Sequence, residues 1–265
     1  MTSWSMHPRA AFDLETTGKD PRTARIVTAS IVMVDESGAV AESYEWLADP
    51  GVEIPEEAAA IHGISTAHAR ENGRPSDEVT AEVGAVLATL FANDIPVIAF
   101  NASYDFTVLA NEARRHELTQ ITASPVIDPF ICNKHVDRFR KGSRTLVALC
   151  EEYGINLEDA HTSAADAEAT LRLADALAAK YSALRIDLNE LHAAQVGWAR
   201  EQAADNIEAN SEAVADNLEE AADNATTSAG ESVLENRADA VRATGENQAQ
   251  DMRTNDPDTN LSNGF

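Results

Sequence analysis

The chain has 265 residues, with 45 acidic side chains against 20 Lys and Arg, and its formal net charge is −25. That length holds one domain of ordinary size plus an extra segment, or two small domains, and it can bury a large core. The charge excludes a generic nucleic-acid coat protein, which would be basic. No stretch approaches the roughly 18 consecutive apolar residues of a membrane span, so we expect no membrane association.

Two features favour a cytoplasmic location. Residues 1–15 lack the apolar run of a secretion signal. Cys132 and Cys150 have no paired spacing and lie in apolar or mixed segments, as reduced structural thiols do.

Five strands and four helices are expected over residues 1–200. Strands are indicated by alternating or β-branched apolar residues at 9–17, 26–35, 40–48, 96–100 and 125–128. Helices are indicated by apolar residues at helical spacing over 76–91, 104–117, 146–153 and 164–181, with Ser76 as a cap and Gly154 as an end. The first three strands predict an antiparallel meander and the short later runs predict buried parallel strands. This order predicts an α/β fold, a mixed five-stranded sheet with helices on its faces.

The C-terminal part differs in composition. Residues 201–265 contain 15 acids and 3 bases and are dominated by Asn, Ala, Glu, Asp and Ser. So few large apolar side chains cannot offset the entropy of ordering the segment. Ile207, Val214 and Leu218 recur at intervals of seven and four, which predicts one weak helical face; no internal repeat is apparent.

We therefore divide the chain into a domain over 1–203 and an acidic tail over 204–265 that is largely disordered or partly helical. Such a tail serves as a solubilising segment or competes with nucleic acid for basic side chains. Its end, residues 260–265, loosely resembles the Leu/Phe peptides that bind sliding clamps, although it lacks their usual Gln.

Acidic side chains are the candidates for chemistry. On a strand over 9–17, Phe12 and Leu14 point into the core, and Asp13 and Glu15 point together to the other face. Two adjacent carboxylates repel unless a cation lies between them, and acid-only sites suit Mg²⁺ or Mn²⁺. Alone, the pair is more typical of a solvated strand face.

Two later motifs extend this set. Asp105 lies in the first turn of a helix that follows a predicted strand, a position where α/β proteins form sites. His161 and Asp166 open the long helix at 164–181. Taken singly, the acids are ordinary helix N-terminal charges and His161 is a loop histidine, but the three motifs in this order form a constellation that chance seldom supplies.

The constellation resembles the DEDDh group of 3′–5′ exonucleases, which includes the proofreading epsilon subunits of bacterial DNA polymerase III. The matching segments are FDLETTG (12–18), AIHGIS (60–65), NASYDF (101–106) and HTSAAD (161–166). Two departures are Phe100 where the family often has His, and Ala164-Ala165 before Asp166 where Leu is common. The resemblance spans about 10–181 and implies a ribonuclease H-like fold.

The resemblance also implies roles for the five residues. Asp13 would bridge two divalent ions, Glu15 and Asp166 would complete the shell of the ion that carries the attacking water, and Asp105 would serve the second ion. Such ion pairs clamp a phosphodiester undergoing in-line displacement. His161 would accept the proton of that water, since the usual pKa of His lies near neutral pH. The product would be a nucleoside 5′-monophosphate.

The same resemblance suggests contacts to the last nucleotides of a strand. The expected residues lie in the first motif, the His-Gly-Ile segment and the second motif: Leu14, Thr16, Thr17, His62, Ile64, Asn101 and Phe106. For His62 and Ile64, a loop turn and a core residue remain the alternative, and Phe106 is equally typical of a core aromatic.

A basic cluster opposes the overall charge. Residues 134–144 hold five bases and one acid, and Arg140 and Lys141 are the predicted contacts to strand phosphates. The alternative is a solvated helix-and-turn face.

Three functions follow from these patterns. The first is a metal-dependent 3′–5′ exonuclease that acts on a single-stranded or frayed DNA 3′ end, alone or with a DNA polymerase or sliding clamp. The second is an exoribonuclease or oligoribonuclease-like enzyme, and the third is a non-catalytic replication accessory module. The complete set of four acids and one histidine argues against the third.

Overall fold

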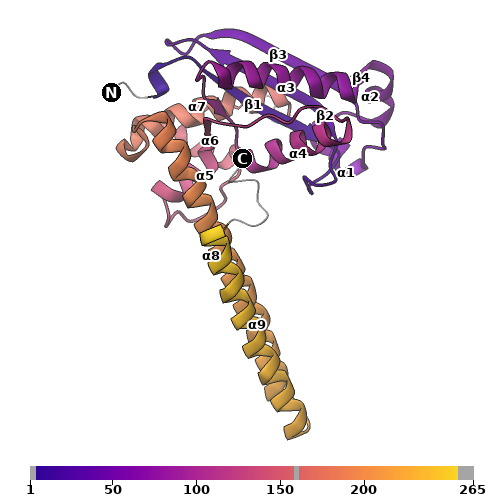
Figure 1. The fold of residues 1–265 in the computed structure, drawn as a ribbon, viewed down its shortest axis with the longest axis vertical. Coiled ribbons are helices and arrows are strands. Elements are labelled where there is room, and N and C mark those ends of the chain that lie inside the picture. The colour runs from indigo at the N-terminus through magenta and orange to yellow at the C-terminus, as the bar shows by residue number, and fades with distance from the viewer. Residues whose placement is uncertain (1–3, 158–160, 256–265) are drawn as a thin grey trace. The chain divides into compact units, whose positions relative to one another are not determined.

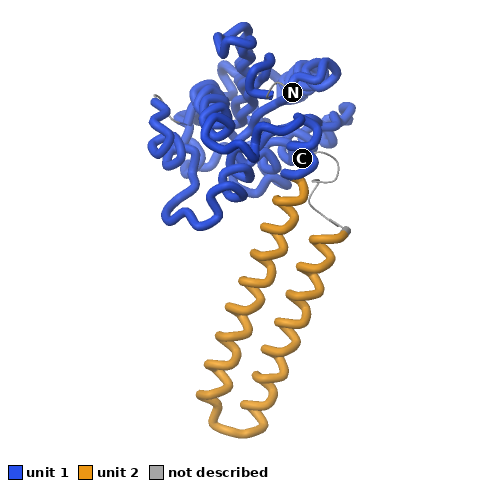
Figure 2. Tube along the Cα trace, turned by 90° about the vertical axis from the view of Figure 1, so that its left-hand side faces the viewer, with its two compact units in different colours: residues 1–195, 263–265 blue, residues 196–262 orange. Residues whose placement is uncertain are grey.

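A computed structural model describes residues 4–157 and 161–255. The chain divides between Gln195 and Val196 into two compact units (Figure 2). The predicted boundary, at residue 203, lies further along the same helix. Within the described residues, no helix is both long and apolar enough to cross a membrane.

The first unit is built around a mixed sheet (Figure 1). Its six strands are β1 (Arg9–Thr16), β2 (Ile26–Val34), β3 (Val40–Asp49), β4 (Arg74–Pro75), β5 (Val97–Ile98) and β6 (Val126–Ile127). They lie in the order β4-β3-β2-β1-β5-β6. The predicted antiparallel meander of β1, β2 and β3 is confirmed. The predicted parallel strand over 96–100 is confirmed as β5, which pairs with β1 and with β6. The prediction of five strands omitted β4, which has two residues and therefore no periodicity to detect.

Seven α-helices of the first unit have the bounds α1 (Glu56–His62), α2 (Thr66–Asn72), α3 (Ser76–Ala92), α4 (Ala102–Arg115), α5 (Pro129–Val136), α6 (Leu146–Tyr153) and α7 (Ser163–Lys180), with single 3-10 turns at Trp4–Met6 and Ser182–Leu184. The four predicted helices are α3, α4, α6 and α7. The missed helices have only seven or eight residues, too few to show a helical period.

Side-chain alternation along β1 shows that helices cover both faces of the sheet. The ring of Phe12 packs on that of Phe106 from α4, with centroids 5.4 Å apart. Arg9 points to the opposite face and its Nε donates to Asp175 of α7 at 3.0 Å. Asp13 shares the face of Arg9, so the α7 side is where its carboxylate projects.

Two predicted helix boundaries have different outcomes. Gly154 ends α6 in a left-handed conformation with φ 67°, as predicted. The predicted cap at Ser76 is wrong: Pro75 precedes the helix, and the Ser76 hydroxyl donates to Glu112 of α4 at 3.0 Å. The hydroxyl therefore donates to a buried carboxylate across the helix pair instead of accepting from an N–H group of its own first turn.

Helix α8 (Leu188–Asp223) begins in the first unit. Gln195 is fully buried, and its side-chain carbonyl accepts from the backbone N–H of Asp128 at 2.7 Å. Its amide nitrogen donates to the carbonyl of Val126 at 3.1 Å. These bonds attach the start of α8 to β6 at the sheet edge.

The second unit is a hairpin of α8 and α9 (Ser228–Asn255), which lie side by side and antiparallel (Figure 2). It is more helical than the disordered or partly helical tail that composition predicted. Ala204 and Ala215 of α8 and Ala238 and Ala249 of α9 are buried. A methyl group at Gly245 would meet the Cβ of Ser211 at 2.3 Å, so the two backbones approach closely.

Paired charges further explain why this acidic segment is helical. Arg242 of α9 makes ion pairs with three acids of α8, namely Glu212, Asp216 and Glu219. Arg253 does the same with Glu201, Asp205 and Glu208. Each of these two arginines therefore offsets the charge of three acids on successive turns of α8.

These contacts also reveal an internal repeat, although none was predicted from the sequence. Residues 201–208 and 212–219 both follow Glu-x-x-Ala-Asp-Asn-(Ile/Leu)-Glu, and the two arginines of α9 are also 11 residues apart. Eleven residues make about three helical turns, so equivalent side chains return to one face. The clamp-like segment over 260–265 lies outside the described residues.

Candidate active site

Strand β1 supplies the first two carboxylates. Phe12 is fully buried and Leu14 is nearly so, whereas Asp13 and Glu15 are half-buried on the opposite face. Burial raises the pKa of Asp13 well above its usual value, and the charges of Asp105, Asp166 and Glu15 add to that effect. Burial, with Asp166 second, raises the pKa of Glu15 to about 7.

Asp105 joins this pair from the first turn of α4. Its side chain is buried, and one oxygen accepts from the backbone N–H of Leu14 at 3.1 Å. That bond fixes the start of α4 against β1, between the positions of Asp13 and Glu15. Burial raises the pKa of Asp105 well above its usual value, although backbone hydrogen bonds oppose the shift.

The third motif completes the cluster. Ligand atoms of Glu15, His161 and Asp166 all lie within 4.8 Å of one another. His161 adopts a left-handed backbone with φ 74°, and its N–H donates to Asp166 at 3.4 Å. The hydroxyl of Thr162 accepts from Ala165 and caps α7, so Asp166 lies in the first helical turn as predicted. The loop and the helix end thus hold an exposed imidazole beside two carboxylates.

The donor set is suited to divalent metal. Four carboxylates meet beside β1, a central strand of the sheet. Burial raises the pKa of all four, and repulsion from neighbouring carboxylates adds to the shift for Asp13, Glu15 and Asp105. A positive charge between them would relieve both costs. Oxygen ligands of this kind are the ones that Mg²⁺ and Mn²⁺ prefer.

Asp128, which sequence analysis missed, organises the second motif. Its carboxylate is buried and accepts from the N–H groups of Asn101 and Ala102, each at 3.0 Å. It also accepts from Phe130 and caps α5. Asn101 itself is exposed, with φ 59°, at the start of α4. The available signal was an acid at the C-terminal end of the strand predicted over 125–128, where α/β proteins form sites.

Thr16 and Thr17 have structural partners. The Thr16 hydroxyl lies 2.5 Å from that of Tyr104 and 3.0 Å from the carbonyl of Gly18. The Thr17 hydroxyl accepts from the N–H of Arg25 at 2.9 Å. These bonds define the turn after β1.

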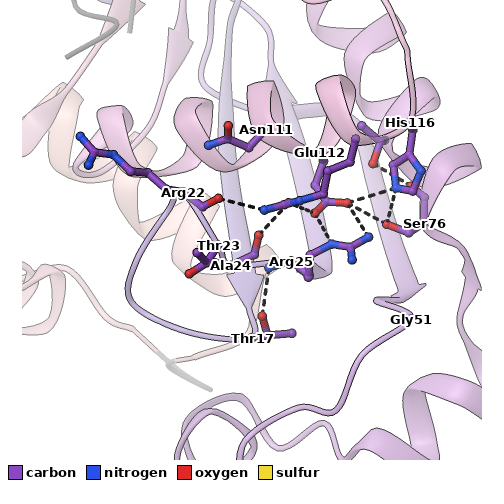
Figure 3. A network of polar contacts seen from close by, with 12 residues as sticks. Thr17, Arg22, Thr23, Ala24, Arg25, Gly51, Ser76, Asn111, Glu112 and His116 are labelled. Atoms are coloured by element: carbon purple, nitrogen blue, oxygen red, sulfur yellow. Dashed lines mark hydrogen bonds and ion pairs between the residues drawn. The ribbon is translucent and has the colours of Figure 1, made fainter. Parts of the chain in front are cut away.

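A buried ion-pair network ties that turn to α4 (Figure 3). Glu112 of α4 is fully buried and binds the side chains of Arg25 and Arg115, each with a nitrogen–oxygen distance of 2.5 Å. Arg115 also donates to the carbonyls of Ala24 and Arg22. The hydrogen bond from Leu14 to Asp105 and this network therefore both hold α4 against β1 and the turn that follows it.

The His-Gly-Ile segment lies beside the end of β1. His62 is 9% exposed, and its Nδ1 accepts from the N–H of Ile64 at 3.2 Å. Burial lowers the pKa of His62, while the backbone of Thr16 opposes that shift. Ile64 is half-buried against the small apolar cluster of Val27 and Ile54.

Two predicted substrate contacts are core side chains. Phe106 is 3% exposed and packs between Phe12 and Phe91, whose centroids lie 5.4 and 6.2 Å from its own. Leu14 is 6% exposed. Both form the apolar floor under the carboxylates, so we assign them to packing.

The basic cluster is partly neutralised. Arg140 forms an ion pair with Glu152 and donates to the carbonyl of Ser143. Lys141 is exposed, and the neighbouring Phe139 is 90% exposed. Lys134 lies over the ring of Phe130 at 4.5 Å. An exposed aromatic ring among basic side chains was not singled out from the sequence, because Phe139 follows no period.

Similarity to known proteins identifies the family of this chain. A family model described as an exonuclease matches residues 10–174. The chain belongs to this exonuclease family. Membership confirms the predicted DEDDh-type 3′–5′ exonuclease class and the enzymatic assignment.

Curated relatives are similar over the same region. A DNA polymerase III subunit epsilon-like protein of Rhodobacter capsulatus is 32% identical over 179 residues, which are 64% of this chain and 24% of that protein. A PolC-type DNA polymerase III of Streptococcus pneumoniae is 30% identical over 164 residues, 61% of this chain and 10% of that protein. The chain therefore spans a minor part of these relatives' length.

Solved structures confirm the predicted ribonuclease H-like α/β fold. E. coli exonuclease I in complex with a dA16 oligonucleotide has a TM-score of 0.59 at 20% identity, covering 67% of this chain and 42% of that chain. Its zinc-bound complex with single-stranded DNA gives the same values.

Proposed function

We propose that the first unit is a metal-dependent 3′–5′ exonuclease that releases nucleoside 5′-monophosphates from DNA 3′ ends. The observation that carries the proposal is the meeting of Glu15, His161 and Asp166 within 4.8 Å, beside the carboxylates of Asp13 and Asp105. Membership of the exonuclease family supports it.

The carboxylates of Asp13, Glu15, Asp105 and Asp166 would hold two divalent ions, Mg²⁺ or Mn²⁺. Bound ions of this type neutralise phosphodiester oxygens and lower the pKa of water. His161 accepts the proton of the attacking water, since its imidazole is exposed and lies beside Asp166. Asp166 accepts the backbone N–H of His161 and so orients the loop that carries the ring.

The 3′ terminus is received by the turn after β1 and the His-Gly-Ile segment. His62 lies against the end of β1, Ile64 packs on the neighbouring cluster of Val27 and Ile54, and Asn101 is exposed at the start of α4. Thr16 and Thr17 shape that turn, because both hydroxyls and the backbone N–H of Thr17 have partners in the fold.

Upstream phosphates meet the basic cluster. Lys141 offers an exposed charge, and Phe139 offers a ring on which a base can stack. Arg140 contributes less, because its charge is already paired with Glu152. The salt dependence of binding tests this contact with phosphates. Lys141→Glu should reduce the magnitude of the slope of log affinity against log salt concentration by about one. An unchanged slope would reject the contact.

One degradation assay tests the proposal. Single-stranded DNA, mismatched duplex and RNA, each labelled at the 5′ end, are incubated with Mg²⁺, Mn²⁺ or EDTA. Stepwise shortening of DNA from the 3′ end, abolished by EDTA and by Asp13→Ala, is expected. Glu45→Gln, an exposed acid on β3, is the matched control and should retain activity. Degradation of RNA alone would assign the exoribonuclease function instead.

The relatives' names suggest the setting. PolC-type and epsilon-like proteins are DNA polymerase III components by name, and we propose a cytoplasmic role in which a polymerase or a sliding clamp holds the enzyme on DNA. Co-purification of the full chain with polymerase subunits tests that association.

A further inference from the structure

The α8–α9 hairpin has two chemically distinct faces. On α8, each of the buried residues Ala204 and Ala215 is followed three positions later by an apolar side chain and four positions later by an acid. Those apolar residues are Ile207 and Leu218. Consecutive helical residues turn about 100° around the axis. The residue three positions after each alanine therefore lies on one side of that alanine, and the residue four positions after it lies on the other side.

Helix α9 repeats the arrangement. Ala238 is followed by Val241 three positions later and by Arg242 four positions later. Ala249 is followed in the same way by Met252 and Arg253. The ion pairs of both arginines with the acids of α8 show that the charged sides of the two helices meet on one face. The opposite face then carries the apolar side chains of both helices.

This apolar face is incompletely covered by the hairpin. Five of its six members are half-buried and the sixth, Val214, is exposed. The six residues are Ile207, Val214, Leu218, Leu234, Val241 and Met252. Val214 is 49% exposed, whereas the small residues between the helices, such as Ala215 and Ala238, are fully buried. Folded domains normally bury their larger apolar side chains in preference to alanine. A further partner would therefore bury what the hairpin leaves in water.

We propose that this apolar face, defined by the six residues above, pairs with the same face of a second copy of the chain to form a four-helix bundle. Charge placement favours this occupant, because the six paired acids lie on the opposite face and two copies meet without bringing carboxylates together. Helix bundles bury facing apolar stripes in this manner.

The face has the dimensions of a stable interface. The 28 residues of α9 span about 42 Å at the rise of an α-helix, and two adjacent helices are about 20 Å wide. The product is about 800 Å² for each copy, which matches one side of an interface of standard size.

Light scattering coupled to gel filtration tests the proposal on the full chain, over protein concentrations of about 1–50 μM. The expected mass is that of a dimer. Val214→Glu is expected to raise the dimer dissociation constant at least about tenfold, because it buries a charge at the interface. The matched control is Ala213→Glu, which adds the same charge one residue away, at an exposed position that points off the apolar face. It should leave the dimer unchanged.

A second measurement separates association from folding. Helical circular dichroism of Val214→Glu should equal that of the wild type, and the wild-type melting temperature should rise with protein concentration. A monomer at the highest concentration, a dimer that Val214→Glu leaves intact, or a melting temperature independent of concentration would each overturn the proposal. Exonuclease activity on a short oligonucleotide is independent of it and remains in either case.

Discussion

The substitution Glu15→Gln should stabilise the metal-free protein at neutral pH. Burial and the neighbouring Asp166 raise the pKa of Glu15 from 4.5 to about 7. Between these values the folded protein keeps a proton that the unfolded chain has released, so this carboxyl's contribution to stability falls as pH rises through the window. Above about pH 7 both states are ionised and the full penalty of burying the charge is present.

The size of that penalty follows from the shift. A change of about 2.5 pKa units corresponds to about 3.4 kcal/mol at about 1.36 kcal/mol per unit. Glu15 is partly exposed, and solvent screening reduces the figure to about 1.5 kcal/mol. Since 1 kcal/mol shifts the melting temperature of a domain of this size by about 2–4 °C, Glu15→Gln should raise it by about 3–6 °C.

Thermal unfolding in EDTA measures this effect at pH 8 and pH 4.5. The difference between Glu15→Gln and wild type should be present at pH 8 and vanish at pH 4.5. The exposed Glu45→Gln is the control and should show no difference at either pH. Addition of Mg²⁺ should stabilise the wild type more than Glu15→Gln. Equal or lower stability of Glu15→Gln at pH 8 would refute the argument that burial and the nearby Asp166 make the Glu15 charge destabilising.

Three further predictions concern activity and stability. Asp13→Ala should abolish release of nucleoside 5′-monophosphate and His161→Ala should lower the rate about 10²–10⁴-fold, both measured by chromatography of the products; full activity of either variant contradicts its role. Glu112→Gln should lower the unfolding free energy by about 3 kcal/mol, because it removes the fully buried carboxylate that pairs with both Arg25 and Arg115; an unchanged urea midpoint argues against this. Gly245→Ala should destabilise the hairpin by clashing across it, whereas Gly197→Ala, with open space around it, should stabilise its helix by up to about 1 kcal/mol; melting followed at 222 nm distinguishes them, and equal effects would disprove the close approach.

The sequence alone was enough to predict the long elements and to propose the catalytic residues. Strands β1 to β3 and helices α3, α4, α6 and α7 are long enough to show their period, and Asp13, Glu15, Asp105, His161 and Asp166 follow from motifs whose spacing is local. Short elements such as β4 and α5 carry too few residues to reveal a period. Their positions are set by pairing with distant strands or by a cap such as Asp128.

Only the tertiary structure decided which side chains were already occupied. Composition cannot tell that the Thr17 hydroxyl binds Arg25, that Phe106 lies in the core, or that Arg140 is paired with Glu152. The tail gives the clearest case. Its net charge predicts repulsion, but two antiparallel helices bring Arg242 and Arg253 against six acids that lie 23 to 52 residues away in the chain. Long-range pairing of this kind depends on the fold, so no local pattern predicts it.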